Sequence, residues 1–342
     1  MKAVQYYGNG KFLLEDAPIK PPKSDEVVIQ LAYSGICGSD IHIAKGEWDK
    51  RIAVFPRVAG HEGSGIITQV GSDVTDWQIG DRVVVRPLAS CGVCPACKEG
   101  SGNVCKDVKY LGIELDGTFQ NYWTVKADIL HRCPDELSLL HASLAEPLAV
   151  CCHAVHRSGI PAGGKAVVIG GGPIGLMTAV VLKSKGVDVV VSELSEMRLK
   201  NCRKLGIPAL NPANEDICAY VRDWTDNYGV DAVFEASGSQ AGFSTAPELC
   251  RPNGTIVTVA TYAKPMQLVT TPLHFKQLQL VTTRAYQKAD FDEALDLLQK
   301  KLFDCDALIS NVYPLEKLED AIQASMAGVD VVKIVVDCQS IV

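Results

Sequence analysis

The sequence predicts an α/β protein of two domains, in which a compact β-rich part is followed by a doubly wound parallel sheet. Its length of 342 residues suits two domains better than one. Up to about residue 150, short β-rich runs alternate with segments rich in turn-forming residues. From about residue 165, apolar strand patterns alternate with glycine turns and helical patterns, which is typical of a parallel sheet.

The elements of both parts can be placed from their patterns. In the β-rich part, strands are predicted at residues 26–34, 63–71, 81–87 and 119–125. In the second part, a buried strand begins at Lys165 and runs into a glycine turn, and the helix after it ends near Gly186. Further strands are predicted at residues 187–194, 230–238, 255–261 and 278–283. Residues 290–301 and 314–328 have the pattern of amphipathic helices, and residues 331–338 that of a closing strand.

Composition and charge exclude several classes of protein. The chain is 47% hydrophobic and 21% charged, as soluble globular proteins are. A formal charge of −7 and the absence of any run dense in Lys and Arg disfavour a nucleic-acid partner. No apolar run is long enough for a membrane span, and the N-terminus lacks the apolar core of a signal peptide. We therefore expect an unprocessed cytoplasmic protein without a membrane or nucleic-acid partner.

Four of the 13 cysteines are clustered, with the spacing C-x2-C-x2-C-x7-C on a stretch interrupted by Gly and Pro. In a reducing compartment such a cluster more often binds metal than forms disulfides. Four thiolates from one short loop suit a closed tetrahedral Zn²⁺ site. An iron–sulfur cluster is the nearest rival, followed by disulfides and free thiols. Most of the other nine cysteines are interpreted as small buried hydrophobic residues. The clustered residues are Cys91, Cys94, Cys97 and Cys105.

A glycine turn follows the strand that begins at Lys165. Gly170, Gly172 and Gly175 form G-x-G-x-x-G between a strand and a helix, a pattern that brings a pyrophosphate onto the helix N-terminus. Glu193 ends the next strand, where a carboxylate accepts hydrogen bonds from the adenosine ribose and repels a 2′-phosphate. This favours NAD over NADP, although Arg198 could flank the adenine or accept a phosphate. The simpler interpretation is a turn that only packs a helix.

A second set of residues lies upstream. The segment GICGSDIH supplies Cys37, Ser39 and His42, and GHE supplies His61 and Glu62. Each of these is unremarkable alone. Together they offer a thiolate, an imidazole and a carboxylate, which are the donor types of an open catalytic zinc site.

At these residues the chain resembles the zinc-dependent members of the medium-chain dehydrogenase/reductase superfamily, close to the polyol (sorbitol-type) dehydrogenases. The resemblance covers essentially the whole length and keeps the family's order. GICGSDIH, GHE, GDRV at 80–83, the four-cysteine lobe, EPLAV at 146–150 and the glycine turn follow one another. The resemblance implies a structural zinc in the four-cysteine lobe and a catalytic zinc at the upstream set, two per subunit.

The resemblance also implies roles for individual residues. Cys37, His61 and Glu62 match the ligands of the catalytic zinc. Glu146 stands where alcohol dehydrogenases have a cysteine, and it is either a fourth ligand that exchanges with water or a partner of that water. Zinc would act as a Lewis acid on the alcohol, hydride would pass to NAD, and the proton would leave through Ser39, the cofactor ribose and His42. The expected cofactor-binding residues are Gly170, Gly172, Pro173, Ile174, Gly175, Glu193 and Arg198.

The implied fold is a GroES-like domain, residues 1–150 and 288–342, interrupted by a Rossmann domain, residues 151–287, with the active site between them and a homodimer or homotetramer as the assembly. The carboxylates of Glu62 and Glu146 favour a polyol, cyclitol, sugar acid or vicinal diol as substrate. Trp48, Arg284 and Tyr286 are candidate substrate contacts, although Ala285 separates an Arg-Tyr pair that is adjacent in polyol dehydrogenases. Threonine 3-dehydrogenase, butanediol dehydrogenase and, remotely, a non-catalytic dinucleotide-binding protein remain alternatives.

Overall fold

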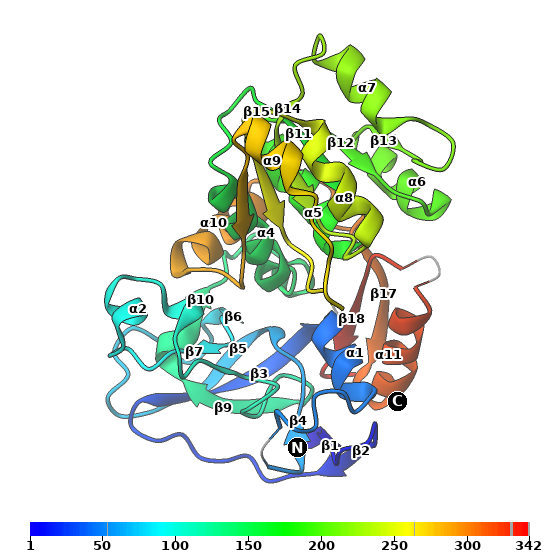
Figure 1. Cartoon of the computed structure of the whole chain (residues 1–342). Coiled ribbons are helices and arrows are strands. Elements are labelled where there is room, and N and C mark those ends of the chain that lie inside the picture. Colours follow the sequence, from blue (N-terminus) through cyan, green and yellow to red (C-terminus); the bar gives the residue numbers. More distant parts are fainter. Residues whose placement is uncertain (53, 263, 329–330, 341–342) are drawn as a thin grey trace. The chain divides into compact units, whose positions relative to one another are not determined.

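The computed structural model describes residues 1–52, 54–262, 264–328 and 331–340, and it divides the chain into two compact units (Figure 1). The first unit comprises Met1–Glu146, Ala294–Lys301 and Leu308–Val342, and the second comprises Pro147–Glu293 and Leu302–Ala307. The sequence placed these boundaries at 150 and 288. The second boundary lies inside one helix, α10 (Lys288–Gln299), so no change of texture marks it in the sequence.

The first unit is built around a seven-stranded sheet whose main path runs β10-β6-β5-β3-β18-β17, with β9 also paired to β3. The strands predicted around residues 26–34, 63–71, 81–87 and 119–125 are confirmed. They are β3 (Glu26–Gly35), β5 (Glu62–Val70), β6 (Arg82–Val85) and β9 (Tyr122–Lys126), and the remaining strands of this sheet are β10 (Leu130–Arg132), β17 (Ile309–Pro314) and β18 (Lys333–Asp337).

Strand β3 is central because three strands pair with it. It runs antiparallel to β5, β9 and β18, and its Val- and Ile-rich sequence buries residues on both faces. Strand β18 comes from the end of the chain, so the sheet joins the first and last segments of the first unit. One core of this unit contains Val27, Ile29, Leu31, Ile67, Val83 and Trp123.

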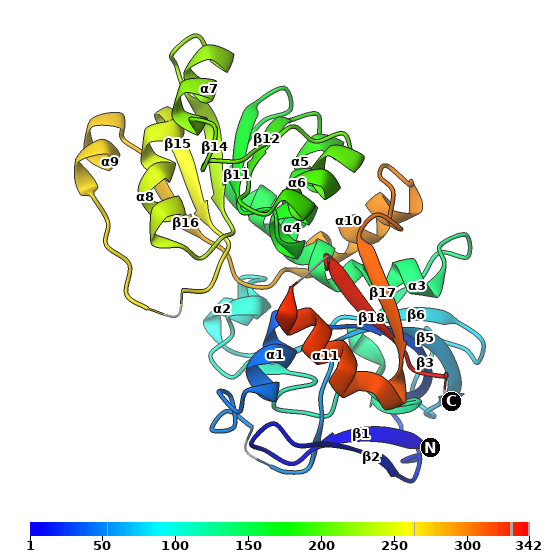
Figure 2. The same cartoon turned by 90° about the vertical axis from the view of Figure 1, so that its right-hand side faces the viewer.

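The other elements of the first unit are short and surround this sheet (Figure 2). Two small sheets have the orders β2-β1-β4 and β7-β8. Their strands are β1 (Lys2–Tyr6), β2 (Phe12–Asp16), β4 (Arg57–Val58), β7 (Leu88–Ala89) and β8 (Lys109–Tyr110). The helices are α1 (Gly38–Ala44), α2 (Pro95–Lys98), η1 (Gly102–Val104), η2 (Ala127–Ile129), α3 (Leu139–Ala142), η3 (Leu315–Lys317) and α11 (Leu318–Ala327).

The second unit is a parallel sheet of six strands in the order β13-β12-β11-β14-β15-β16. The order reverses between β11 and β14, and ligands of doubly wound sheets bind beyond the carboxyl ends of the strands at such a point. All the strands predicted for this region are found: β11 (Lys165–Ile169), β12 (Asp188–Ser192), β14 (Val230–Glu235), β15 (Cys250–Thr258) and β16 (Gln279–Thr282). The short strand β13 (Ala209–Leu210) was not predicted.

Helices connect the strands of the second unit. They are α5 (Pro173–Ser184), α6 (Glu196–Lys204), α7 (Ile217–Trp224), α8 (Gln240–Leu249) and α9 (Thr270–Lys276), and α4 (Ala145–Ser158) precedes the sheet. None of the helices in the described ranges is both long and apolar enough to span a membrane.

One polar cluster in the second unit joins α4 to α10. His153 Nδ1 lies 2.8 Å from one oxygen of Asp290, and His156 Nδ1 lies 2.5 Å from the other. Burial raises the pKa of Asp290, but hydrogen bonds from His153, the Gln287 backbone and His156 outweigh it and leave that pKa below its usual value. A shared carboxylate therefore fixes two turns of α4 on the first turn of α10.

Candidate functional site

Cys37, His61 and Glu62 meet in the first unit. One donor atom of each lies within 4.8 Å of the other two, although the residues come from two separate segments. Cys37 is the residue just before α1, and His61 and Glu62 stand where β5 begins. Because β3 and β5 are paired, the end of β3 brings Cys37 beside the start of β5. His61 and Glu62 are 5% and 1% exposed, so the cluster lies largely out of water.

Local sequence explains this geometry. The backbone N–H of Cys37 donates to the buried Asp40 carboxylate at 2.8 Å, which fixes the turn into α1. Gly60, with φ +86°, precedes His61, and a Cβ there would lie 2.7 Å from Thr118 Oγ1. Only glycine therefore allows the chain to deliver His61 at this point.

Acidic side chains surround His61 in this cluster. Burial lowers the pKa of His61, yet the charge and hydrogen bond of Cys37, with the charges of Asp40 and Glu146, outweigh it and raise the pKa to about 10. The imidazole would thus hold a proton where three acidic groups converge. Such a field attracts a cation.

A zinc ion fits this donor set. Thiolate, imidazole and carboxylate are its common ligands, and three protein ligands leave the fourth tetrahedral position open. Among the described buried atoms, His61 Nδ1 and Asp40 Oδ1 have no hydrogen-bond partner, which is unusual for buried polar atoms. The charge of Glu146 helps to raise the pKa of His61, but its carboxylate is not within 4.8 Å of all three donors.

Lys333 is a residue of this site that sequence reasoning missed. Its ammonium nitrogen lies 2.6 Å and 2.5 Å from the two carboxylate oxygens of Glu62, and it donates to the Ile36 carbonyl at 2.8 Å. Burial lowers the pKa of Lys333, but the charges of Glu62 and Cys37 outweigh this and raise it. A lysine inside the apolar run 331–338 was the one available signal.

The predicted relay residues lie on α1. Ser39 Oγ is 3.4 Å from His61 Nε2, so this hydroxyl adjoins the cluster. His42 follows three residues later on the helix, its Nδ1 lies 2.5 Å from Glu47, and its ring stacks on Trp48 at 5.1 Å between centroids. The sequence did not single out Glu47, which holds the imidazole with Trp48.

The four clustered cysteines also converge. Their sulfurs all lie within 4.8 Å of one another, with Cys94 to Cys97 at 3.5 Å and Cys91 to Cys97 at 4.0 Å. A tetrahedral ion with bonds of about 2.3 Å to sulfur needs sulfurs about 3.8 Å apart. The backbone N–H of Cys97 lowers the pKa of Cys94 to about 6, which favours the thiolate. All 13 cysteines are described and none is bridged, so this lobe suits one ion and not disulfides.

The glycine turn in the second unit has the form that the motif predicts. Gly170 has φ +98°, and a Cβ on Gly175 would lie 1.9 Å from the Gly170 carbonyl oxygen. Gly172 caps α5, and Pro173 and Ile174 begin it. The turn thus lets the helix start directly against the end of β11, and the first backbone N–H groups of α5 are left for a phosphate.

Glu193 stands beyond the end of β12 and is tightly held. Its carboxylate accepts hydrogen bonds from the backbone of Gly171, Leu194 and Ser195 at 2.7, 2.7 and 2.9 Å. Arg198 Nη1 lies 3.6 Å from the same carboxylate. Since a carboxylate offers about four acceptor positions, roughly one is left for a ribose hydroxyl.

Two family models match the chain. Residues 23–135 match the alcohol dehydrogenase GroES-like domain, and residues 173–300 match the zinc-binding dehydrogenase domain. The chain is 39% identical to 2-dehydro-3-deoxy-L-galactonate 5-dehydrogenase of Pseudoalteromonas atlantica over 99% of each chain. The chain belongs to the zinc-binding alcohol dehydrogenases.

Other matches confirm the polyol branch of these dehydrogenases. The chain is 34% identical to a sorbitol dehydrogenase of Halalkalibacterium halodurans over 96% of this chain and 97% of that one. Two solved structures each give a TM-score of 0.92. One is 2R,3R-butanediol dehydrogenase of Bacillus subtilis, with 30% identity over 98% of this chain and 99% of that one. The other is a putative zinc-binding dehydrogenase of Sinorhizobium meliloti bound to NADP, with 28% identity over 98% of each.

The three candidate substrate contacts have different surroundings in this dehydrogenase. Trp48 is half-buried between the His42 ring and the Arg51 guanidinium, which lies 4.9 Å from its centroid. Arg284 is exposed. Tyr286 is 1% exposed and packs on Phe291 with centroids 5.5 Å apart, which is the environment of a core residue. The role of each toward a substrate stays a prediction.

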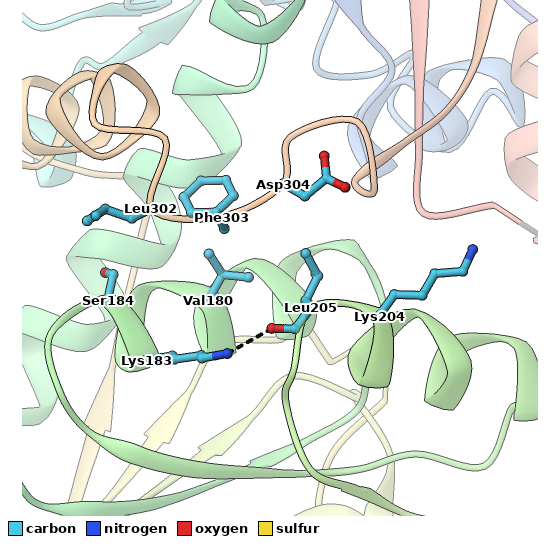
Figure 3. Close-up of a pocket in the computed structure, with 8 residues that line it drawn as sticks. All are labelled: Val180, Lys183, Ser184, Lys204, Leu205, Leu302, Phe303 and Asp304. Carbon is cyan, nitrogen blue, oxygen red and sulfur yellow. Dashed lines mark hydrogen bonds between the residues drawn. The ribbon is translucent and has the colours of Figure 1, made fainter.

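A hollow of about 390 Å³ in the second unit lies away from the glycine turn (Figure 3). It is at the C-terminal end of α5, whereas the turn is at the N-terminal end, about 18 Å away along a helix of 12 residues. Lys183 at its edge donates to the Leu205 carbonyl at 2.9 Å. This hollow is therefore not the dinucleotide site of the dehydrogenase. It is lined by Val180, Lys183, Ser184, Lys204, Leu205, Leu302, Phe303 and Asp304.

Proposed function

We propose that this dehydrogenase oxidises a secondary alcohol of a sugar acid or polyol to a ketone with NAD, using one catalytic and one structural zinc ion per subunit. The observation that carries the proposal is the convergence of three donors, the half-buried Cys37 and the buried His61 and Glu62. Three ligands leave a position for the oxygen of an alcohol, whereas the four-cysteine lobe supplies a complete shell.

Cys37, His61 and Glu62 would hold the zinc ion, which would supply Lewis-acid chemistry toward an alcohol oxygen. The glycine turn and Glu193 would hold the nicotinamide nucleotide, which would supply a hydride acceptor. The burial of His61 and Glu62 keeps water from screening charges at the zinc site. Glu146 supplies a further negative charge, either as a fourth zinc ligand that exchanges with water or as a hydrogen-bond partner of that water.

Two residues of α1 move the proton in this proposal. Ser39 Oγ, beside His61, would accept the hydroxyl proton of the substrate and release its own proton, and His42 would take up that proton by way of the cofactor ribose and deliver it to water. The His42 side chain is 45% exposed, and Glu47 occupies its Nδ1, so Nε2 is the nitrogen that takes the proton. The approach of Ser39 to the cluster supports the first step.

NAD is the cofactor that the Glu193 environment supports. A carboxylate held in place by three backbone hydrogen bonds repels a 2′-phosphate. Arg198 is already paired with that carboxylate, which weakens it as a phosphate receptor. The NADP in the Sinorhizobium meliloti relative is the observation against this choice.

A sugar acid is the substrate class that we favour within the family. The relative with 39% identity over almost the whole chain is named for oxidation at C5 of a sugar acid. The exposed guanidinium of Arg284 is the proposed receptor for the carboxylate of such a substrate. The likeness to a butanediol dehydrogenase makes a vicinal diol the second candidate.

We also propose a homo-oligomer that forms through the second unit. Strand β16 ends its sheet, so one of its edges has no strand partner among the described residues. Phe275, Val269 and Leu280 around it are 81%, 63% and 41% exposed. An exposed strand edge with apolar side chains around it is a liability unless another chain covers it. Light scattering tests this, because Leu280→Lys should lower the mass toward that of one subunit. A cytoplasmic location, where thiolates stay reduced, completes the proposal.

The decisive assay measures NADH formation with a panel of alcohols. It should include 2-dehydro-3-deoxy-L-galactonate, sorbitol, (2R,3R)-butanediol and threonine, with His61→Ala as the inactive control. We expect the highest kcat/KM with the sugar acid, and Arg284→Met should raise KM for that substrate but not for butanediol. The proposal would be refuted if threonine were the only alcohol turned over, or if His61→Ala left the measured turnover unchanged.

A further inference from the structure

Lys333 reaches Glu62 across an intervening strand. Strand β3 lies between β18 and β5, and on it Gly35 pairs with Val335 on one side and with Glu62 on the other. Lys333 and Val335 share a face of β18, so the lysine passes over Gly35 to the carboxylate. A Cβ on Gly35 would lie 2.0 Å from Glu62 Oε2 and 3.0 Å from Lys333 Cε. The missing side chain is what makes room for the pair.

The pair also bears on the charge of the zinc site. The acidic groups of the site are the thiol of Cys37 and the carboxylates of Asp40, Glu62 and Glu146. The Lys333 ammonium, 5% exposed, adds a positive charge to that of a bound Zn²⁺. It also donates a hydrogen bond to the carbonyl of Ile36, the residue before Cys37, so one cation contacts both ligand-bearing segments.

We propose that Lys333 is a positioning residue that competes with zinc for the Glu62 carboxylate and thereby makes Glu62 an exchangeable ligand. The proposal rests on the zinc site of the proposed function. A carboxylate that already accepts a hydrogen bond from an ammonium group at 2.6 Å donates less charge to a metal. Glu62 can therefore leave the metal without becoming an unpaired buried charge. A coordination position then becomes available when a substrate needs it.

A purely structural role predicts a different behaviour. Strands β5 and β18 are both already paired with β3, so the sheet does not need this ion pair to hold it together. Buried ion pairs are often no more stabilising than apolar residues of similar volume. If the pair were only a brace, replacing Lys333 would change the stability of the protein but not the rate at which zinc leaves.

The test measures zinc release from the full-length, zinc-loaded protein in excess chelator with a chromogenic indicator. Release from two sites should give two kinetic phases. The phase that is missing in Cys37→Ser is assigned to the catalytic site, and the phase that is missing in Cys94→Ser is assigned to the cysteine lobe. Lys333→Met should slow the catalytic-site phase at least about tenfold, since a neighbouring positive charge is removed. Lys333→Arg should stay near wild type. The matched control is Lys165→Met, which removes a partly buried lysine of the second unit that donates to Trp224.

A Co²⁺-substituted sample gives a second readout. The ligand-field absorption of Lys333→Met should differ from that of wild type and Lys333→Arg, because the carboxylate then binds the metal permanently. Unchanged or faster zinc release in Lys333→Met would overturn the inference. If wild type and Cys37→Ser released zinc in the same phases, no zinc would be bound at Cys37, and the proposed function would be overturned instead.

A double variant covers the case in which Lys333→Met does not fold. With Glu62→Gln there is no carboxylate charge to compete for, so adding Lys333→Met to Glu62→Gln should change zinc release by less than about threefold. A tenfold slowing in that comparison would show that Lys333 acts on the metal without Glu62, and would overturn the inference.

Discussion

Gly35→Ala is the substitution with the most direct structural consequence. The added Cβ would lie 2.0 Å from Glu62 Oε2, whereas ordinary contact begins at 3.4 Å, so the oxygen must retreat by about 1.4 Å. Strand β3 cannot yield instead, because β5, β9 and β18 all pair with it. The retreat lengthens the contact between Glu62 and Lys333.

The expected loss of stability follows from these two effects. Overpacking a buried position costs about 1–3 kcal/mol. Separating a buried ion pair costs up to about 3–5 kcal/mol when one charge is left unpaired. Since the pair is displaced and not deleted, we expect the free energy of unfolding to fall by about 3 kcal/mol. Urea unfolding of chelator-treated protein measures this loss. We also expect a lower zinc content at the Cys37 site.

Two controls make the experiment specific. Gly38→Ala places a Cβ where nothing lies within 4 Å, so its unfolding free energy should stay within about 0.5 kcal/mol of wild type. Combining Gly35→Ala with Glu62→Asp shortens the carboxylate side chain and should recover part of the lost stability. A Gly35→Ala protein as stable as Gly38→Ala, with full zinc content, would refute the reasoning.

Further predictions concern separate parts of the molecule. Cys94→Ser should remove one zinc and lower Tm, and His61→Ala should remove the other zinc and turnover but keep the fold, as elemental analysis and circular dichroism would show. Glu193→Ala should narrow the ratio of kcat/KM for NAD to that for NADP, and an unchanged ratio would contradict its role. His42→Gln should depress oxidation most at low to neutral pH and recover partly as pH rises; a profile merely scaled from wild type would contradict a relay. Asp290→Asn should destabilise the protein by about 1–3 kcal/mol at pH 7. The native pKa of Asp290 is depressed, so its contribution is complete above about pH 4 and is lost as pH falls through that native value, and the deficit of the variant should shrink there in urea titrations.

The fold was largely predictable because its signals are local. The apolar run around Val28 and the alternation that follows Lys165 are properties of a few neighbouring residues, and the strands form there. The unit boundary was less accessible, because it lies within α10 between Glu293 and Ala294 and not in a linker. Local composition carries no information about which unit each half of a helix joins.

The candidate site was predictable only in part. Cys37 and His61 could be paired because a resemblance linked two distant motifs. Lys333 could not, since its contact with Glu62 depends on the register of β18 and β5 on β3, and 271 positions separate the two residues. The burial of Tyr286 was hidden for the same reason, because it is a property of tertiary packing.

The crossing of Lys333 over Gly35 has a consequence for the order in which the protein assembles during synthesis. Cys37, His61 and Glu62 leave the ribosome early, and the whole parallel sheet of the second unit can form before residue 333 emerges. Until then Glu62 has no ammonium partner, and β3 lacks one of its neighbours. A growing chain can therefore complete the cysteine lobe, whose ligands span only residues 91–105, while Glu62 still lacks the lysine that competes for its carboxylate. The centre whose ligands are made first would be finished last.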